Sequence, residues 1–94
     1  MAITQDHIAR AVRMARDYGA TRVVVFGGAI DHPERTRDLD LAVAGVDGWD
    51  LYTLGARINR SLGVPVDLVA LDPPTPFSRS VEEWGRVLYD AAVE

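Results

Sequence analysis

The sequence predicts an α/β (α+β) fold, a mixed β-sheet with helices on one face, in the order α-β-β-α-β-α-β. Three observations lead to this prediction. Three segments carry apolar residues at the spacing of amphipathic helices, and four shorter runs are rich in valine and leucine. Glycine or proline separates these segments from one another. With the helices on one side, the other face of the sheet is left free for a functional site.

Length and composition bound the class of protein. The chain has 94 residues, so we expect residues 1–94 to form a single small domain. Cysteine is absent, which excludes disulfides and thiolate zinc sites and suits a cytoplasmic protein. No apolar run approaches the length of a membrane helix, and residues 1–20 are too charged for a secretory signal.

The charged residues exclude further classes. The formal net charge is −4. Nucleic acids attract basic protein surfaces through their phosphates, so we do not expect direct nucleic-acid binding to be the main activity of an acidic chain. All 10 basic residues are arginines. A lysine-dependent phosphate loop and a Schiff-base mechanism are therefore excluded.

The N-terminal third predicts a helix followed by a strand. Thr4 is expected to cap the helix and Gly19 to end it. The β-branched run from Thr21 to Phe26 then predicts a strand that stops at Gly27-Gly28. The inward side of the helix is the apolar stripe Ile8, Val12, Ala15 and Tyr18.

The middle of the chain predicts a loop, a strand and a second helix. The loop from Ala29 to Arg37 is charged and contains a proline, so it should be exposed. Asp38 to Val43 alternates polar and apolar residues as a strand does. Asp47 can cap the second helix, and Gly63 can end it.

The last third predicts a strand, a short helix and a final strand. Val64 to Leu71 is near-continuously apolar except for Asp67. After a proline-rich break, Thr75 can cap a short helix that Gly85 ends. Arg86 to Tyr89 predicts the closing strand.

Three aspartates are the candidate metal ligands. Residues two apart in a strand project the same way, so Asp38 and Asp40 share a face, and Asp67 joins them if its strand is a neighbour. Three clustered carboxylates repel one another unless a cation sits among them. Oxygen ligands without a nearby histidine or cysteine favour Mg²⁺, with Mn²⁺ as a substitute.

Structural interpretations of the same aspartates stay open. Asp38-Leu39-Asp40-Leu41 is also the pattern of an ordinary half-exposed strand. Asp67 can instead lie on an edge strand or pair with an arginine.

Gly27-Gly28 has two interpretations as well. One is a tight turn that needs a positive φ at glycine. The other is a loop whose backbone N–H groups approach a triphosphate because no side chain intervenes.

Taken together, these features resemble the DNA polymerase β-type nucleotidyltransferase superfamily, and in particular its small members, the minimal nucleotidyltransferases. The resemblance rests on a strand ending in Gly27-Gly28, nine intervening residues, Asp38-Leu39-Asp40, and Asp67 in the apolar strand. It extends over most of the chain, including VDLVAL and the ending GRVLYD. The fold it implies is the nucleotidyltransferase fold.

The resemblance also implies roles for these residues. Asp38, Asp40 and Asp67 would be catalytic residues and ligands of two Mg²⁺ ions, with Asp67 as the base for the incoming hydroxyl. Gly27 and Gly28 would contact the phosphates of ATP. Minimal nucleotidyltransferases usually have Gly-Ser followed closely by Ala-Arg-Gly, whereas here Gly28 replaces the serine and no arginine follows closely. Arg35 or Arg37 would be the substitute cation, or both are solvated loop residues.

The expected partner also follows from the resemblance. Minimal nucleotidyltransferases are typically paired with a HEPN-domain protein, often as the antitoxin of an RNase toxin. We therefore expect an Mg²⁺-dependent transfer of AMP from ATP to a hydroxyl of such a partner protein. The alternative is a catalytically impaired binding module that neutralises or scaffolds its partner by contact.

The remaining aromatic and histidine side chains carry weaker expectations. The helical spacing of Trp84 predicts a core residue, whereas Trp49, at the start of a helix, is expected to be half exposed and to help a partner bind. His7 has no expected role. His32 is expected to be an exposed loop residue, or a contact to a phosphate or a base.

Overall fold

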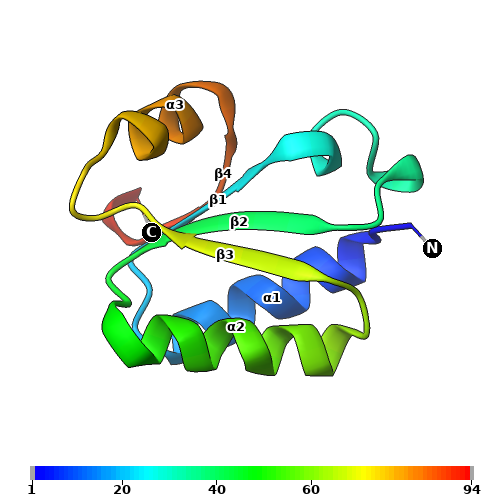
Figure 1. Cartoon of the computed structure of the whole chain (residues 1–94), viewed down its shortest axis with the longest axis horizontal. Coiled ribbons are helices and arrows are strands. Elements are labelled where there is room, and N and C mark those ends of the chain that lie inside the picture. Colours follow the sequence, from blue (N-terminus) through cyan, green and yellow to red (C-terminus); the bar gives the residue numbers. More distant parts are fainter. Residues whose placement is uncertain (1, 94) are drawn as a thin grey trace.

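The computed structural model describes residues 2–93, which form a four-stranded sheet with helices on both faces (Figure 1). The strands lie in the order β3-β2-β1-β4. β1 is antiparallel to β2 and β4, and β3 is parallel to β2, so the predicted mixed sheet is confirmed. The strands are β1 (Arg22–Phe26), β2 (Leu39–Ala44), β3 (Val66–Ala70) and β4 (Arg86–Asp90). The helices are α1 (Gln5–Asp17), α2 (Gly48–Leu62) and α3 (Pro76–Trp84), with short 3-10 turns η1 (Gly27–Ala29), η2 (Pro33–Arg35) and η3 (Ala91–Val93).

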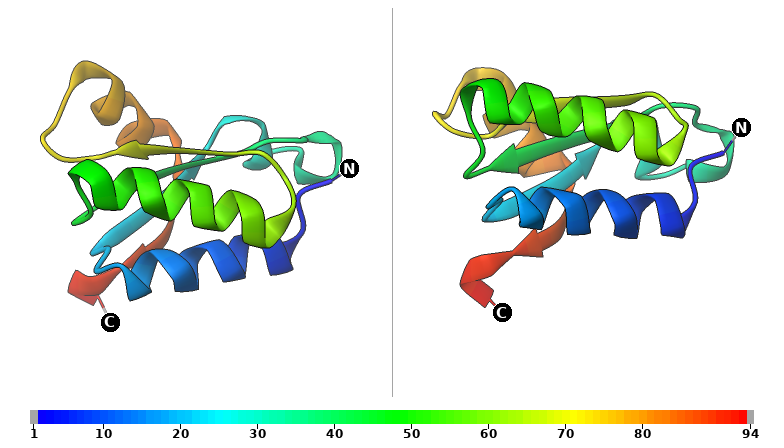
Figure 2. Two further views of the ribbon diagram at one scale, coloured as in Figure 1. Left: turned by 60° about the horizontal axis from the view of Figure 1, so that its bottom comes forward. Right: turned by 90° about the horizontal axis from the view of Figure 1, so that it is seen from below.

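The main core lies between the sheet and the pair α1 and α2. Figure 2 shows these two helices side by side under one face of the sheet. Val23 and Val25 of β1 and Leu41 of β2 point into this layer and are buried. They meet Leu54 and Ile58 of α2, which lie four residues apart and therefore on the same side of that helix.

The position of α3 corrects the expectation that all helices cover one face. α3 packs on the opposite side of the sheet, where Val81 forms a second, smaller core with Val24 and Ala42. The reason is the run of three buried valines in β1. Successive side chains of a strand point to opposite faces, so Val24 needs cover on the side away from Val23 and Val25. Only part of that face is covered, and the rest remains open.

The helix ends follow the predicted capping residues in most cases, although Asp47 precedes α2 without a capping hydrogen bond from its side chain. Thr4 caps α1, and His7 completes a capping box because its Nδ1 accepts a hydrogen bond from the Thr4 backbone N–H at 3.0 Å. Gly63 ends α2 in the left-handed conformation, with a φ of 71°. Thr75 caps α3. His7 therefore has a structural role that the sequence did not indicate.

Two residues fix α3 against the sheet. The Arg22 side chain of β1 donates a hydrogen bond to Glu82 of α3 at 2.8 Å and forms a second ion pair with Asp90 of β4. The hydrogen bond to Glu82, together with both negative charges, raises the pKa of the Arg22 guanidinium. Gly85, which follows α3, lies so close to β1 that a Cβ there would be 2.6 Å from Val24 Cγ1.

The helices are also short. Within residues 2–93, none is long and apolar enough to cross a membrane.

Candidate functional site

Two carboxylates lie side by side on the face of the sheet that carries α3. Asp40 of β2 and Asp67 of β3 are opposite one another in the parallel register. Asp40 has the same strand parity as Ala42, and Asp67 the same as Val69, both of which pack on the α3 side. The sequence placed the two aspartates on a shared face, and the sheet order makes their strands neighbours.

Asp38 lies just outside the strand. β2 begins at Leu39, so Asp38 ends the preceding loop instead of opening the strand, and it is exposed. The negative charge of Asp38 still acts on Asp40, and it therefore contributes to the raised pKa of the Asp40 carboxyl. Asp38 thus stays within electrostatic reach of Asp40, although it lies outside the strand.

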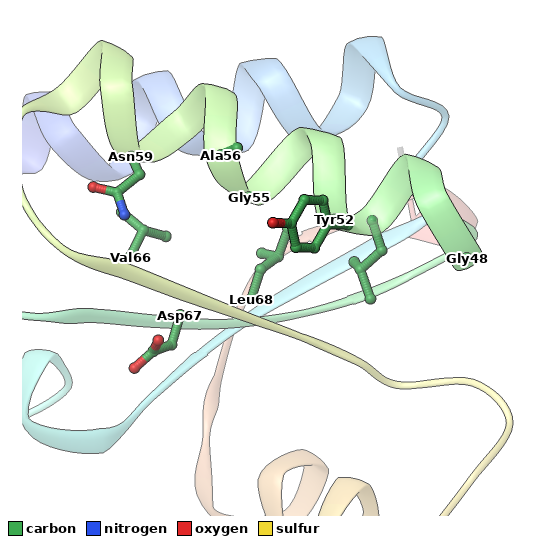
Figure 3. Close-up of a pocket in the computed structure, with 9 residues that line it drawn as sticks. Gly48, Tyr52, Gly55, Ala56, Asn59, Val66, Asp67 and Leu68 are labelled. Carbon is green, nitrogen blue, oxygen red and sulfur yellow. The ribbon is translucent and has the colours of Figure 1, made fainter.

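The Asp67 side chain points away from the main helix layer. Figure 3 shows it on the opposite side of β3 from α2, whereas Val66 and Leu68 project toward that helix. The space between α2 and β3 is a pocket of about 500 Å³. Its walls are formed by Tyr52, Gly55 and Asn59 among others, and Asp67 is the one carboxylate among the residues that line it. This pocket is therefore not the place where the carboxylates converge.

The electrostatics of Asp40 reflect the crowding of negative charge. Burial raises the pKa of the Asp40 carboxyl, and the charges of Asp67 and Asp38 raise it further. A hydrogen bond with Asp67 adds to the rise. A divalent cation would offset this repulsion, so the chemistry of the donor set fits a hard metal ion.

The carboxylates are not yet arranged as a closed metal cage. Among residues 2–93, no group of three or more acidic or histidine side chains has the spacing of a ready metal site. Asp38 and Asp67 are both exposed, so their side chains have room to turn toward a cation. The donor set fits, and the site would have to close around the metal.

Gly27 forms the wall of the site beside Asp40. Its φ of 76° is one that glycine adopts without strain, and β1 turns there into η1. A Cβ on Gly27 would lie 2.4 Å from Asp40 Oδ2. The structure therefore confirms the tight-turn interpretation of Gly27, and the missing side chain leaves room for the Asp40 carboxylate. The approach of its backbone N–H group to a triphosphate stays a prediction.

Gly28 differs from Gly27, since its φ is not positive. A Cβ on Gly28 would lie 2.7 Å from the Thr36 hydroxyl oxygen. That hydroxyl donates a hydrogen bond to the His32 carbonyl at 2.7 Å and so holds the loop over the turn. Sequence reasoning missed Thr36, because seven residues lie between it and Gly28 and only the folded loop brings the two together.

The other candidate residues of the loop and the two tryptophans are exposed to solvent. Arg35, Arg37 and His32 are exposed, and His32 lies 3.9 Å from Glu34. The expectation that Trp84 belongs to the core is wrong, because 76% of its surface is exposed. Trp49 is 83% exposed, more than the half that was expected. In α3 it is Val81 that is buried against the sheet, whereas Phe77 and Trp84 are exposed.

Several solved structures have a fold similar to that of this chain. The chain is similar to a solved toxin–antitoxin complex with AMP-PNP, at 20% identity and a TM-score of 0.74, over 94% of this chain and 74% of that one. It is similar also to a complex of tri-AMPylated Shewanella oneidensis HEPN toxin with MNT antitoxin. That match has 21% identity and a TM-score of 0.74, over 95% of this chain and 74% of that one. At these identities the likeness shows a shared fold.

A third structure is more similar in sequence. It belongs to a protein provisionally identified as a minimal nucleotidyltransferase, and the match has 30% identity and a TM-score of 0.65. The match covers 85% of this chain and 86% of that chain. No protein-family model and no curated protein matches the sequence. The shared fold, together with this identity over most of both chains, shows that the chain belongs to the minimal nucleotidyltransferase family.

Proposed function

We propose that residues 1–94 form a single Mg²⁺-dependent nucleotidyltransferase domain that transfers AMP from ATP to a hydroxyl of a HEPN-domain partner protein, as that protein's antitoxin. The observation that carries this proposal is the pairing of Asp40 with Asp67 on the partly open face, with Gly27 against Asp40. Family membership supports the class of reaction. The absence of cysteine is in keeping with a cytoplasmic protein.

Each site residue has a defined task in this proposal. Asp38, Asp40 and Asp67 hold two Mg²⁺ ions, for which Mn²⁺ can substitute. Bound there, the ions supply charge neutralisation for the triphosphate and for the departing pyrophosphate. Gly27 and Gly28 present backbone N–H groups to the phosphates, because no side chain stands between the turn and the ligand.

The reaction is an in-line substitution at the α-phosphorus of ATP. The partner's hydroxyl oxygen forms a bond to this phosphorus, and the bond from the phosphorus to the oxygen bridging to the β-phosphate breaks. Pyrophosphate leaves with that bonding electron pair. Asp67 accepts the hydroxyl proton, since its exposed carboxylate lies beside Asp40 on the side open to a partner.

The partner assignment draws on the structural neighbours. One similar structure is a complex of MNT antitoxin with an AMPylated HEPN toxin, and another contains AMP-PNP. A sheet face that α3 covers only in part leaves a second protein access to the carboxylates. On this open side, the partner would present the acceptor hydroxyl.

The test is transfer of AMP onto a HEPN-domain protein encoded beside this chain. Purified partner is incubated with Mg²⁺ and ATP labelled at the α-phosphate, with wild type or with Asp38→Asn. We expect label on the partner with wild type and a loss of at least about 100-fold with the variant, as when a metal-dependent stabilisation of the transition state is removed. Label from γ-labelled ATP would indicate phosphoryl transfer and would contradict the proposal.

A second candidate function is neutralisation of the partner by contact alone. Two observations favour it: the carboxylates of the described residues do not form a ready metal site, and Gly28 lacks the hydroxyl usual in the family. The same two proteins discriminate the candidates. Undiminished neutralisation of the partner by Asp38→Asn, without label from any variant, would establish the contact-only antitoxin.

A further inference from the structure

A small apolar pocket lies next to the carboxylate cluster, and neither the sequence nor the family assignment gives it a role. Its volume is about 200 Å³. It is formed where β1 runs into the glycine turn and α3 passes over it. The residues that line it include Phe26, Gly27, Ile30, Ser80, Val81 and Trp84.

This pocket and the carboxylate site share a wall. Phe26 is the partner of Asp40 across the antiparallel pair of β1 and β2. Gly27 lines the pocket, and it is also the residue whose missing side chain leaves room for the Asp40 carboxylate. The pocket and the carboxylate site are therefore adjacent at Gly27.

The size and the surface of the pocket fit one aromatic ring system. Pockets that enclose a whole drug-sized ligand are roughly 300–1,000 Å³, so a smaller one suits a fragment of a ligand. The indole of Trp84 is 76% exposed although α3 is well ordered by its caps. The Phe26 ring meets Phe77 of α3 edge to face, with centroids 5.8 Å apart. An exposed indole beside an apolar hollow is a stacking surface, and no side chain of residues 2–93 fills it.

The pocket is rigidly framed. Arg22 holds Glu82 of α3 at 2.8 Å, and Gly85 lies directly against β1. The left-handed turn at Gly27 fixes the opposite wall. A framed apolar slot loses little conformational entropy when a flat ring enters it.

From this continuity we infer that the pocket is the base subsite of the nucleotide, with Trp84 as the stacking residue and a purine as the preferred base. The inference rests on the proposed function, because it takes the phosphates to lie at Gly27-Gly28 and the carboxylates. A purine covers more of the apolar wall than a pyrimidine does, so burial favours ATP over CTP. Trp84 would then determine the choice of base, while the carboxylates act on the phosphates.

The chain offers a direct probe, since Trp49 and Trp84 are its two tryptophans and both are exposed. In Trp49→Phe, fluorescence reports on Trp84 alone. The titrations are done with Mg²⁺, because Mn²⁺ would itself quench the fluorescence. We expect ATP to quench the Trp84 fluorescence and CTP to do so only at higher concentration. Inorganic tripolyphosphate should leave it unchanged. Equal responses to ATP and tripolyphosphate would overturn the inference, because the base would then make no contact.

Affinity provides the second arm. Trp84→Leu should weaken ATP binding about 10-fold in calorimetry, as loss of a base–aromatic stack does, and should leave tripolyphosphate binding unchanged. Trp49→Leu, a matched loss of an exposed tryptophan in α2, should change neither. If Trp84→Leu transfers AMP with an unaltered affinity for ATP, the base subsite is wrong while the proposed function stands. A loss of partner binding alone would place Trp84 in a protein interface and would also overturn the inference.

Discussion

Gly27 and Asp40 lie against one another, so close that a Cβ on the glycine would be 2.4 Å from Asp40 Oδ2. The glycine belongs to the turn that ends β1, and the aspartate belongs to the neighbouring strand β2. The proposed phosphate-binding turn therefore packs directly against the carboxylate that is proposed to bind the metal. Changes at either residue should be felt by the other.

Gly27→Ala should damage the site beyond its effect on the backbone. Alanine at a positive φ costs roughly 1–2 kcal/mol, and the new methyl group also displaces the Asp40 carboxylate. Gly19→Ala is the matched control, because Gly19 has a φ of 93° with no atom within 4 Å of its Cβ position. We expect both variants to lose stability in denaturant unfolding and only Gly27→Ala to lose Mn²⁺-ATP binding. Equal nucleotide affinities would show that the contact with Asp40 has no functional consequence.

Asp40→Asn should stabilise the metal-free protein at neutral pH. The folded-state pKa of Asp40 is raised, so the stability it contributes when protonated is lost as the pH rises through that pKa. An asparagine stays neutral and avoids that loss. We therefore expect the Tm in EDTA to rise.

The pH dependence provides the check on this explanation. The advantage of Asp40→Asn should disappear as the pH falls below the ordinary range of a carboxyl group, because Asp40 is then protonated as well. Asp31→Asn, in the exposed loop, is the control and should not show this profile. A destabilised Asp40→Asn protein at neutral pH would instead identify the carboxylate as a structural partner.

The Thr36 side chain should limit what a serine at position 28 can do. Gly28→Ser restores the hydroxyl usual in the family, but its Cβ would lie 2.7 Å from Thr36 Oγ1. We therefore expect Gly28→Ser combined with Thr36→Ala to bind ATP more tightly than Gly28→Ser alone. Thr36→Ala by itself removes the bond to the His32 carbonyl and serves as the control. Equal affinity of the single and double variants would mean that Thr36 moves aside without cost.

Two glycines should respond to alanine with opposite signs. At Gly85 a Cβ would lie 2.6 Å from the Val81 carbonyl oxygen and 2.8 Å from that of Val25, so Gly85→Ala should cost about 1–3 kcal/mol as overpacking does. At Gly55, inside α2, the nearest atom is Leu68 Cβ at 3.6 Å. Gly55→Ala should therefore gain about 0.5–1 kcal/mol from helix propensity. Urea unfolding of both variants measures this, and a stable Gly85→Ala protein would contradict the described position of α3.

Much of this arrangement is predictable from local rules. Side chains alternate along a strand, so Asp40 points to the face of the sheet opposite to that of Leu39 and Leu41. The caps at Thr4 and Thr75 follow from side-chain chemistry that acts within one turn. These features depend on residues a few positions apart, and the structure confirms them.

The features that escaped prediction depend on contacts between distant segments. Val24 belongs to an apolar run that does not show which element covers each face, so the side occupied by α3 was not predictable. Trp84 follows the helical spacing of core residues. However, α3 packs on β1 and β2 through Val81, and Trp84 stays exposed. Thr36 reaches Gly28 only through the folding of the loop.

Calorimetric titration with Mn²⁺ and ATP tests most directly whether the three aspartates act as a metal and nucleotide site. The protein is titrated beside the double variant Asp38→Asn with Asp40→Asn, and far-UV circular dichroism establishes that both are folded. Wild type should bind Mn²⁺-ATP with metal-dependent heat, and the double variant should bind it at least about 100-fold more weakly, since two of the three carboxylate ligands are gone. Equal binding by the two proteins would show that the aspartates are structural and would contradict the proposed site.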